Sequence, residues 1–181
     1  MLKKRFFTLF GIVGPLTAMV FISLSMFLSH WFSWSQNALS DLGHSINSPV
    51  AALFNFGLLL TGFFIILYSL TSFRKHAKNT SYFLLAAGLS LQFIAMFDEV
   101  YGSLHTAVSI LFFIMLSLSS ISYFVEKRST LAAFALIIGV LFWVIYGLDL
   151  CAFGIAVPET VSSVASAFWV IRSSYLLWTS D

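Results

Sequence analysis

FFTLFGIVGPLTAMVFISLSMFL, residues 6–28, contains no charged side chain and is long enough to cross a lipid bilayer as a helix. A helix needs roughly 20 mostly apolar residues to span a hydrocarbon core of about 30 Å. Three basic residues precede the run, as in a signal peptide, but the run is longer than a signal sequence and no small-residue cleavage site follows it. We therefore expect an uncleaved first membrane helix.

Five further apolar runs of similar length follow along the chain. With the first, the expected spans cover residues 6–28, 49–72, 80–97, 104–124, 129–149 and 158–178. The last is the least apolar, because it contains several serines and Arg172. Short loops join the six runs, and the runs and loops together account for nearly the whole chain. The sequence therefore predicts a single all-α domain over residues 1–181, an integral membrane bundle of six transmembrane helices.

The composition excludes several other classes of protein. Of the 181 residues, 60% are hydrophobic and 9% are charged, whereas a soluble domain is about 25% charged. Such a chain cannot cover a water-soluble globule with polar groups, so a soluble enzyme, a disordered chain and a nucleic-acid binder are excluded. The single cysteine, Cys151, excludes an internal disulfide and a multi-cysteine metal site.

The basic residues predict the orientation in the membrane. In the six-span arrangement all nine fall on one side: Lys3, Lys4, Arg5, Arg74, Lys75, Lys78, Lys127, Arg128 and Arg172. Loops rich in Lys and Arg stay in the cytoplasm. We therefore expect a multi-pass protein of the cell (plasma) membrane with both its N- and C-termini cytoplasmic.

Acidic residues and histidines gather on the opposite, outer side. Five of the seven acids and three of the four histidines lie there: Asp41, Asp98, Glu99, Asp149, Glu159, His30, His44 and His105. The positive-inside rule constrains cations and leaves acids almost free. The outer side is therefore where function is expected.

The first outer loop and the outer ends of the spans carry a polar pattern. If residues 31–42 form an interfacial helix, one of its faces is polar and comprises Asn37, Ser40, Asp41 and His44. Asn55 and Gln92 lie roughly 9 Å inside their spans. The pattern predicts a polar cup that opens outward and closes halfway across the membrane. The alternatives are a solvated interfacial helix and hydrogen bonds that only join spans.

Three titratable side chains are candidates for chemistry. Glu99 and His105 flank the short turn between the third and fourth spans, where they can form an acid–base pair or share a metal, and Asp41 is a second candidate base. Glu159 follows Pro158 at an expected helix start, where helix capping explains it equally well. The ligand spacing is not diagnostic of any metal, so no cofactor is evident and a divalent metal is left as an alternative.

Four motifs resemble, in order and spacing, a known prokaryotic membrane family. They are NALSDLG (37–43), LFNFGLLLTG (53–62), MFDEVYGSLH (96–105) and GIAVPE (154–159). On these motifs the chain resembles the six-span family called domain of unknown function 998. Glu99, His105 and Glu159 match the pattern of that family, Asp98 replaces its usual proline, and His44 has no counterpart in it. The resemblance implies a multi-pass membrane protein without an established activity.

A more distant likeness connects the chain with the damage-regulated autophagy modulators, a six-span eukaryotic family. These proteins also have an S-D-x-G element before the second span, which here is Ser40–Gly43. Some of their relatives handle lipids. A likeness of this kind is an analogy and does not establish function.

Three functions are compatible with the sequence, and whether the chain is an enzyme stays open. The leading hypothesis is a membrane protein that binds or handles a lipid headgroup or a small polar ligand. Its cup is expected to be lined by Asn37, Ser40, Asp41, Asn55, Gln92, Glu99, His105 and Glu159. The second is a membrane-embedded hydrolase or transferase acting on lipid, with Glu99 or Asp41 as the base beside His105. The third is a non-catalytic scaffold whose polar residues only bridge helices.

Overall fold

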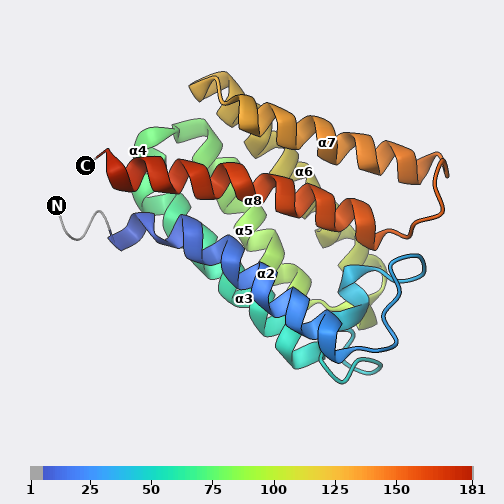
Figure 1. Cartoon of the computed structure of the whole chain (residues 1–181). Coiled ribbons are helices and arrows are strands. Elements are labelled where there is room, and N and C mark those ends of the chain that lie inside the picture. The colour runs from blue at the N-terminus through green and yellow to red at the C-terminus, as the bar shows by residue number, and fades with distance from the viewer. Residues whose placement is uncertain (1–5, 181) are drawn as a thin grey trace.

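Each of the six apolar runs folds into a long helix in the computed structural model, which describes residues 6–180 (Figure 1). The long helices are α2 (Phe10–Leu28), α3 (Ala51–Tyr68), α5 (Lys78–Met96), α6 (Ser103–Lys127), α7 (Thr130–Gly147) and α8 (Ala156–Thr179). The short elements are η1 (Leu39–Gly43), η2 (Ser69–Phe73), α4 (Arg74–His76) and η3 (Glu99–Tyr101). No strand occurs among the described residues, so the prediction of an all-α bundle is confirmed.

Five helical segments are long and apolar enough to cross a membrane, which confirms a multi-pass membrane protein. They are Phe6–Leu28, Ala51–His76, Lys78–Met96, Ser103–Lys127 and Thr130–Gly147. Helix α8 is as long as the others but less apolar, and it buries serines and Glu159 inside the bundle. Polar side chains within a membrane bundle face its interior. The sixth crossing, by α8, therefore stays a prediction that this burial supports.

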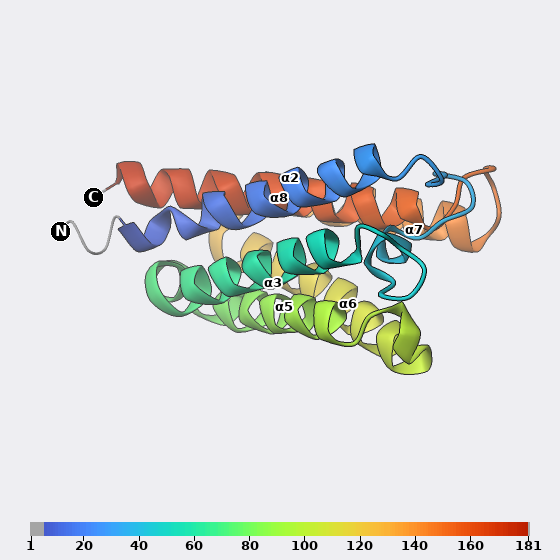
Figure 2. The same cartoon turned by 90° about the horizontal axis from the view of Figure 1, so that it is seen from below.

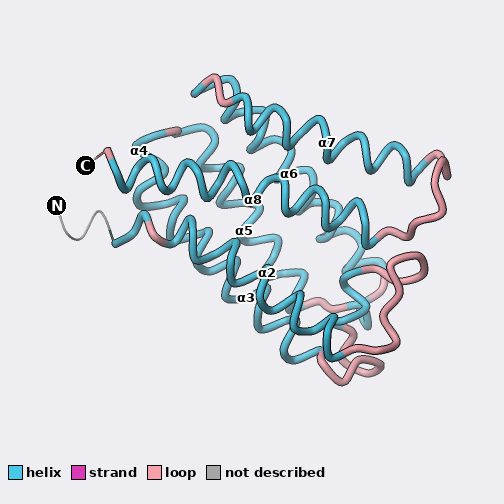
Figure 3. Tube along the Cα trace, viewed as in Figure 1, coloured by secondary structure: helices cyan, strands magenta, loops and turns pink. Residues whose placement is uncertain are grey.

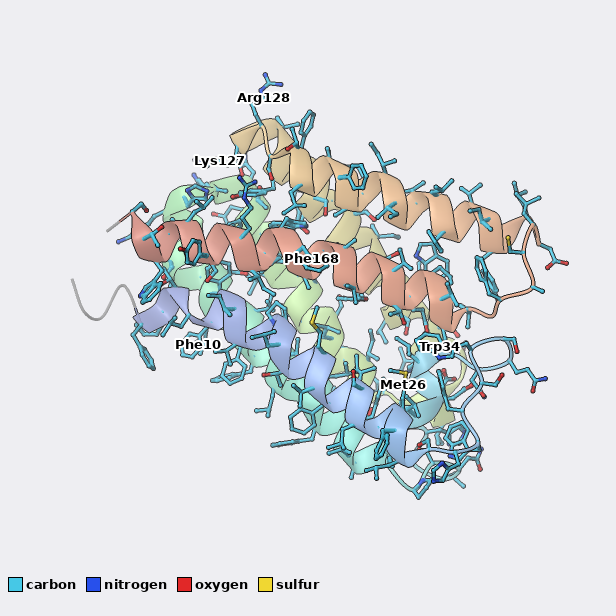
Figure 4. All side chains as sticks on the ribbon, in the orientation of Figure 1. Phe10, Met26, Trp34, Lys127, Arg128 and Phe168 are labelled. Carbon is cyan, nitrogen blue, oxygen red and sulfur yellow. The ribbon has the colours of Figure 1, made fainter. Side chains whose placement is uncertain are left out.

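The bundle has two unlike ends. The described chain begins and finishes at one of them, the terminal end, together with α4 and the α6–α7 turn (Figure 1). Lys127 and Arg128 lie there, and Met26 and Trp34 lie at the opposite end (Figure 4). That opposite end, the loop end, holds the connections 29–50, 97–102 and 148–155 (Figure 3).

The separation of the two ends agrees with the predicted orientation. Lys3, Lys4 and Arg5, on which the prediction also rests, lie outside the described residues. The structure places the remaining cations on helices and turns and contains no membrane that would assign a side. Which end faces the cytoplasm, and which cellular membrane the protein occupies, stay predictions.

Helices α2 and α8 are close at the terminal end and separate toward the loop end. Figure 2 shows them in one layer, with α3, α5 and α6 beneath, and Figure 1 shows them diverging. At the terminal end a Cβ on Gly11 would lie 2.9 Å from the Cβ of Ser174. The Tyr68 hydroxyl is 2.9 Å from that of Ser173, and Trp169 Nε1 donates to Ser120 Oγ at 3.1 Å. Direct contacts with three helices therefore fix this end of α8.

The interfacial helix considered for residues 31–42 does not form over this whole stretch. Only η1 is helical in this stretch. Asn37 Oδ1 accepts from the backbone N–H of Ser33 at 2.9 Å, and Asp41 Oδ2 accepts from that of Ala38 at 3.0 Å. Short polar side chains that bond nearby backbone in this way compete with the helical pattern. The stretch therefore folds as a series of turns.

Candidate functional site

The polar residues of the loop end are arranged around η1. Its backbone and side chains form hydrogen bonds with three other elements. The N–H of Leu39 donates to Glu159 Oε2 of α8 at 2.8 Å, and Ser40 Oγ donates to Glu99 Oε1 of η3 at 2.5 Å. The side-chain amide of Asn55 in α3 donates to the carbonyl of Gly43 at 2.8 Å. A five-residue helix therefore joins three distant parts of the chain.

Glu99 and His105 are in direct contact. His105 Nε2 lies 3.3 Å from Glu99 Oε1 and also 3.3 Å from Ser109 Oγ. Its Nδ1 lies 2.8 Å from the carbonyl oxygen of Phe97, and because a carbonyl only accepts, Nδ1 carries a proton. The imidazole, 4% exposed, is thus held from both sides. Its Nε2 is the ring atom that faces the polar residues of the loop end.

The hydrogen bonds around η3 change the acidity of two carboxyl groups. The side-chain hydrogen bond with His105 is the largest effect on Glu99, and with that of Ser40 it outweighs burial, so the pKa of Glu99 is below its ordinary value. Burial alone would raise the pKa of Asp98, but hydrogen bonds from Ser45 and Val100 lower it overall. Both groups therefore favour the ionised form.

Three of the predicted site residues stabilise the loop around η1. Asp41 Oδ2 accepts from the side-chain amide of Asn37 at 2.9 Å as well as from the backbone of Ala38. The backbone carbonyl of Asn37 accepts from the N–H of Ala156, at the start of α8, at 3.3 Å. Asn55 bonds Gly43, as described above. These residues set the shape of the loop, and their polar atoms are largely occupied in doing so.

Gln92 lies apart from the other candidates. A Cβ on Gly62 would be 2.7 Å from Gln92 Cγ and 2.6 Å from the carbonyl oxygen of Gly88. Gln92 therefore packs where α3 and α5 approach closely.

The structure brings four of the eight predicted residues into one group around η1, which we call the polar cluster: Ser40, Glu99, His105 and Glu159.

No metal site is formed in the part of the chain that the structure describes. No three side chains of His, Cys, Asp or Glu there come close enough together to hold an ion.

Glu159 is 9% exposed and lies within electrostatic range of Glu99, Asp41 and His105. A buried carboxylate needs hydrogen-bond donors, and the N–H of Leu39 supplies one. The polar cluster is therefore an acidic group around a single imidazole.

An apolar cavity lies directly below the polar cluster. It has a volume of about 220 Å³ and lies between α2, α3, α5, α6 and α8. Ser40 and Glu159 line its loop end, and its walls are mainly apolar, with Met19, Leu58, Phe112 and Val170 among them. On α8 it extends from Glu159 to Val170, about 16 Å along the helix axis. The cavity is thus polar at one end and apolar along its length.

These features define a multi-pass α-helical membrane protein with a polar cluster over an apolar cavity. The family model described as "Protein of unknown function (DUF998)" matches residues 12–179, so the chain belongs to this family. The resemblance of its four motifs is thereby confirmed. No curated protein and no solved structure matches the chain. The family description assigns no activity, so function has to be argued from the site.

The cavity itself was not expected from the sequence. Its lining residues, such as Leu58 and Phe112, are the same residue types that pack any membrane helix, so they carry no sequence signal. The hydrogen bond between Leu39 and Glu159 uses a backbone donor and leaves no signal either. The one hint was Glu159, an acid at the start of a serine-rich helix.

Proposed function

We propose that this protein binds a membrane lipid, with the headgroup at the polar cluster and an acyl chain in the apolar cavity below it. One observation carries the proposal. Ser40 and Glu159 line one end of a cavity whose remaining walls are almost entirely apolar. Ligand sites combine apolar walls with a few placed polar groups, and a lipid has that same division between its headgroup and its chain.

We expect the acyl chain to enter the cavity sideways, between α2 and α8. Residues of both helices line the cavity, among them Ile22 and Met26 on α2 and Ser163 and Val164 on α8. The helices touch at the terminal end and separate toward the loop end (Figure 1). Because residues of both helices line the cavity where the helices diverge, we expect a chain to enter it between them while its headgroup stays at the loop end.

The charge of the polar cluster favours one type of headgroup. Glu99, Glu159 and His105 are its titratable groups, and Asp41 and Asp98 lie beside it. No Lys or Arg of the described chain lies in the loop-end connections 29–50, 97–102 and 148–155. An acidic surrounding attracts ammonium groups and accepts hydrogen bonds from hydroxyls. We therefore expect an ammonium or polyhydroxyl headgroup to bind in preference to an anionic one.

The test is the lipid that stays with the purified protein. Mass spectrometry after purification in mild detergent gives moles of lipid per mole of protein. Glu99→Gln and His105→Ala should each lower retention about tenfold, since charge-assisted hydrogen bonds contribute about 1.5–3 kcal/mol and 1.4 kcal/mol is tenfold. Phosphatidylethanolamine should be retained over phosphatidylglycerol.

Two control variants separate this effect from general damage. His44→Ala removes another histidine of the loop end, whose ring bonds Asn47. Glu126→Gln changes a carboxylate near the terminal end of α6 that accepts a hydrogen bond from Thr80. Both should retain lipid as the wild type does. If Glu99→Gln and His105→Ala leave both the retained lipid and the cellular lipid composition unchanged, the proposal is wrong.

A non-catalytic scaffold is the second candidate. It is favoured by the hydrogen bonds of Asn37 and Asp41 within the first loop and by the bond from Asn55 of α3 to Gly43. Catalysis has less support, because the Ser40 hydroxyl donates to Glu99 and not to the His105 imidazole. A carboxylate with a lowered pKa is also a weak base at neutral pH. In the scaffold case, Asp41→Ala would lower stability while retained lipid would be absent from the wild type too.

A further inference from the structure

A second cavity lies on the other side of the α6–α8 contact. It has a volume of about 710 Å³, within the range of about 300–1,000 Å³ typical of small-molecule sites, and lies between α6, α7 and α8. We call it the crevice. On α6 it extends from Thr106 to Ser120, about 21 Å along the axis. Phe113, Val140 and Trp143 are among its apolar walls.

The crevice contains a buried hydroxyl group without a partner. Ser162 on α8 is 8% exposed, and its Oγ has no hydrogen-bond partner. A serine within a helix can donate to the carbonyl four residues earlier, but Ser162 does not. Gly139 on α7 faces it, because a Cβ there would lie 3.1 Å from Ser162 Oγ. An unpaired buried donor is unfavourable, so Ser162 indicates a ligand with an acceptor.

The crevice and the cavity below the polar cluster share part of their walls. The same five residues of α6 and α8 line both: Ser109, Phe113, Leu116, Glu159 and Ser166. Helices α6 and α8 make few direct contacts with each other. A single ligand with two apolar branches can therefore place one branch on each side of this contact.

We propose that the crevice binds the second acyl chain of the same lipid, so that the ligand is a diacyl lipid whose ester carbonyl accepts a hydrogen bond from Ser162. This inference rests on the proposed function. Ser162 lies three residues beyond Glu159, about 4.5 Å deeper along α8. Headgroup, ester and chains of a diacyl lipid follow one another in that same order, so Glu159, Ser162 and the two cavities match its parts.

Native mass spectrometry of the full-length protein tests the number of chains. Detergent-solubilised protein is titrated with a diacyl phosphatidylethanolamine and with its one-chain lyso form. The wild type should bind the diacyl lipid at least tenfold more tightly. Gly139→Leu fills the crevice and should remove this advantage while lyso-lipid binding is unchanged. Gly147→Leu, on the same helix where nothing lies within 4 Å of a Cβ, is the matched control and should behave as the wild type.

A second comparison tests the ester contact. A dialkyl ether analogue has no carbonyl to accept a bond from Ser162. The wild type should prefer the ester lipid about threefold or more, and Ser162→Ala should abolish that preference without weakening binding of the ether lipid. A role of Ser162 in packing alone would not distinguish ester from ether. This comparison also decides the matter if Gly139→Leu fails to fold.

The outcomes separate this inference from the proposed function. If the wild type retains neither lipid, both are wrong. If it binds diacyl and lyso lipids equally and shows no ester preference, the proposed headgroup site stands and the inference of a second acyl chain in the crevice is wrong. Unchanged diacyl binding in Gly139→Leu likewise overturns the placement of the chain in the crevice.

Discussion

The carboxylate of Glu159 accepts a hydrogen bond of 2.8 Å from the backbone N–H of Leu39, which lies 120 residues earlier in the chain. The bond joins the first turn of α8 to the beginning of η1. The acid that accepts it is a buried member of the polar cluster and lines both cavities. Glu159 is therefore one of three side chains, with Glu99 and Asn55, that hold η1 over the bundle.

Replacing Glu159 should reveal this dependence. Glu159→Ala leaves the N–H of Leu39 buried without an acceptor, and such a loss costs about 1–3 kcal/mol. Glu159→Gln keeps an acceptor oxygen and removes a titratable acid close to Glu99 and Asp41, so its effect should be smaller. Thermal unfolding in detergent, followed by tryptophan fluorescence, measures both. Equal losses in the two variants would contradict the role of the bond.

Stability should fall at acidic pH because of Glu99. Its folded-state pKa is below its ordinary value of 4.5, so ionisation is easier in the folded protein. The stabilisation is then fully present above pH 4.5 and is lost as the pH falls from there through the lowered pKa. Glu99→Gln should be less stable than the wild type at pH 7, and the difference should shrink toward pH 4. Parallel unfolding curves across this range would disprove the linkage.

The close approach of α3 and α5 should not tolerate a side chain at Gly62. A Cβ there would lie 2.6 Å from the backbone carbonyl oxygen of Gly88, and backbone cannot move aside cheaply. Gly62→Ala should therefore destabilise the bundle by about 1–3 kcal/mol. Gly147→Ala, with no atom within 4 Å of its Cβ, should be neutral or slightly stabilising. The detergent unfolding midpoints of the two variants provide the comparison.

The single cysteine offers a direct test of orientation. Cys151 is exposed and lies in the connection between α7 and α8 at the loop end. If the termini are cytoplasmic, a membrane-impermeant maleimide should label Cys151 on intact cells. Ser129→Cys in a Cys151→Ser background places the thiol in the α6–α7 turn and should react only after permeabilisation. The reverse pattern would invert the topology.

The helices were predictable from the sequence because each is a long apolar run. Which helices pack against each other was not predictable. The contact between Glu99 and His105 follows from a short turn between two spans. The depth of Gln92 follows from the helical rise, but its packing against Gly62 does not. Lipid-facing and bundle-facing positions of a membrane helix are equally apolar, so periodicity does not show which face is buried.

The first loop does not form a continuous helix, for a local reason. Periodicity alone is compatible with a helix over residues 31–42, but the side chains of Asn37 and Asp41 accept hydrogen bonds from the backbone of Ser33 and Ala38, which competes with the helix. The hydrogen bond between Glu159 and Leu39 depends on which helix stands beside which. No pattern within one segment contains that information, so half of the polar cluster could be assembled only in three dimensions.

Helices α2 and α8, which diverge along the bundle, are connected by contacts at both ends. At the terminal end Gly11 lets the two helices touch near Ser174. At the loop end the chain that leaves α2 is bonded to the beginning of α8, with Gly154 N–H donating to the carbonyl of Trp34 at 2.9 Å. Contacts thus hold the two helices, or the loops next to them, together at both ends of the stretch where they diverge. We expect a lipid that enters there to be selected by the shape of nearby side chains such as Met19 and Met26, which line the cavity.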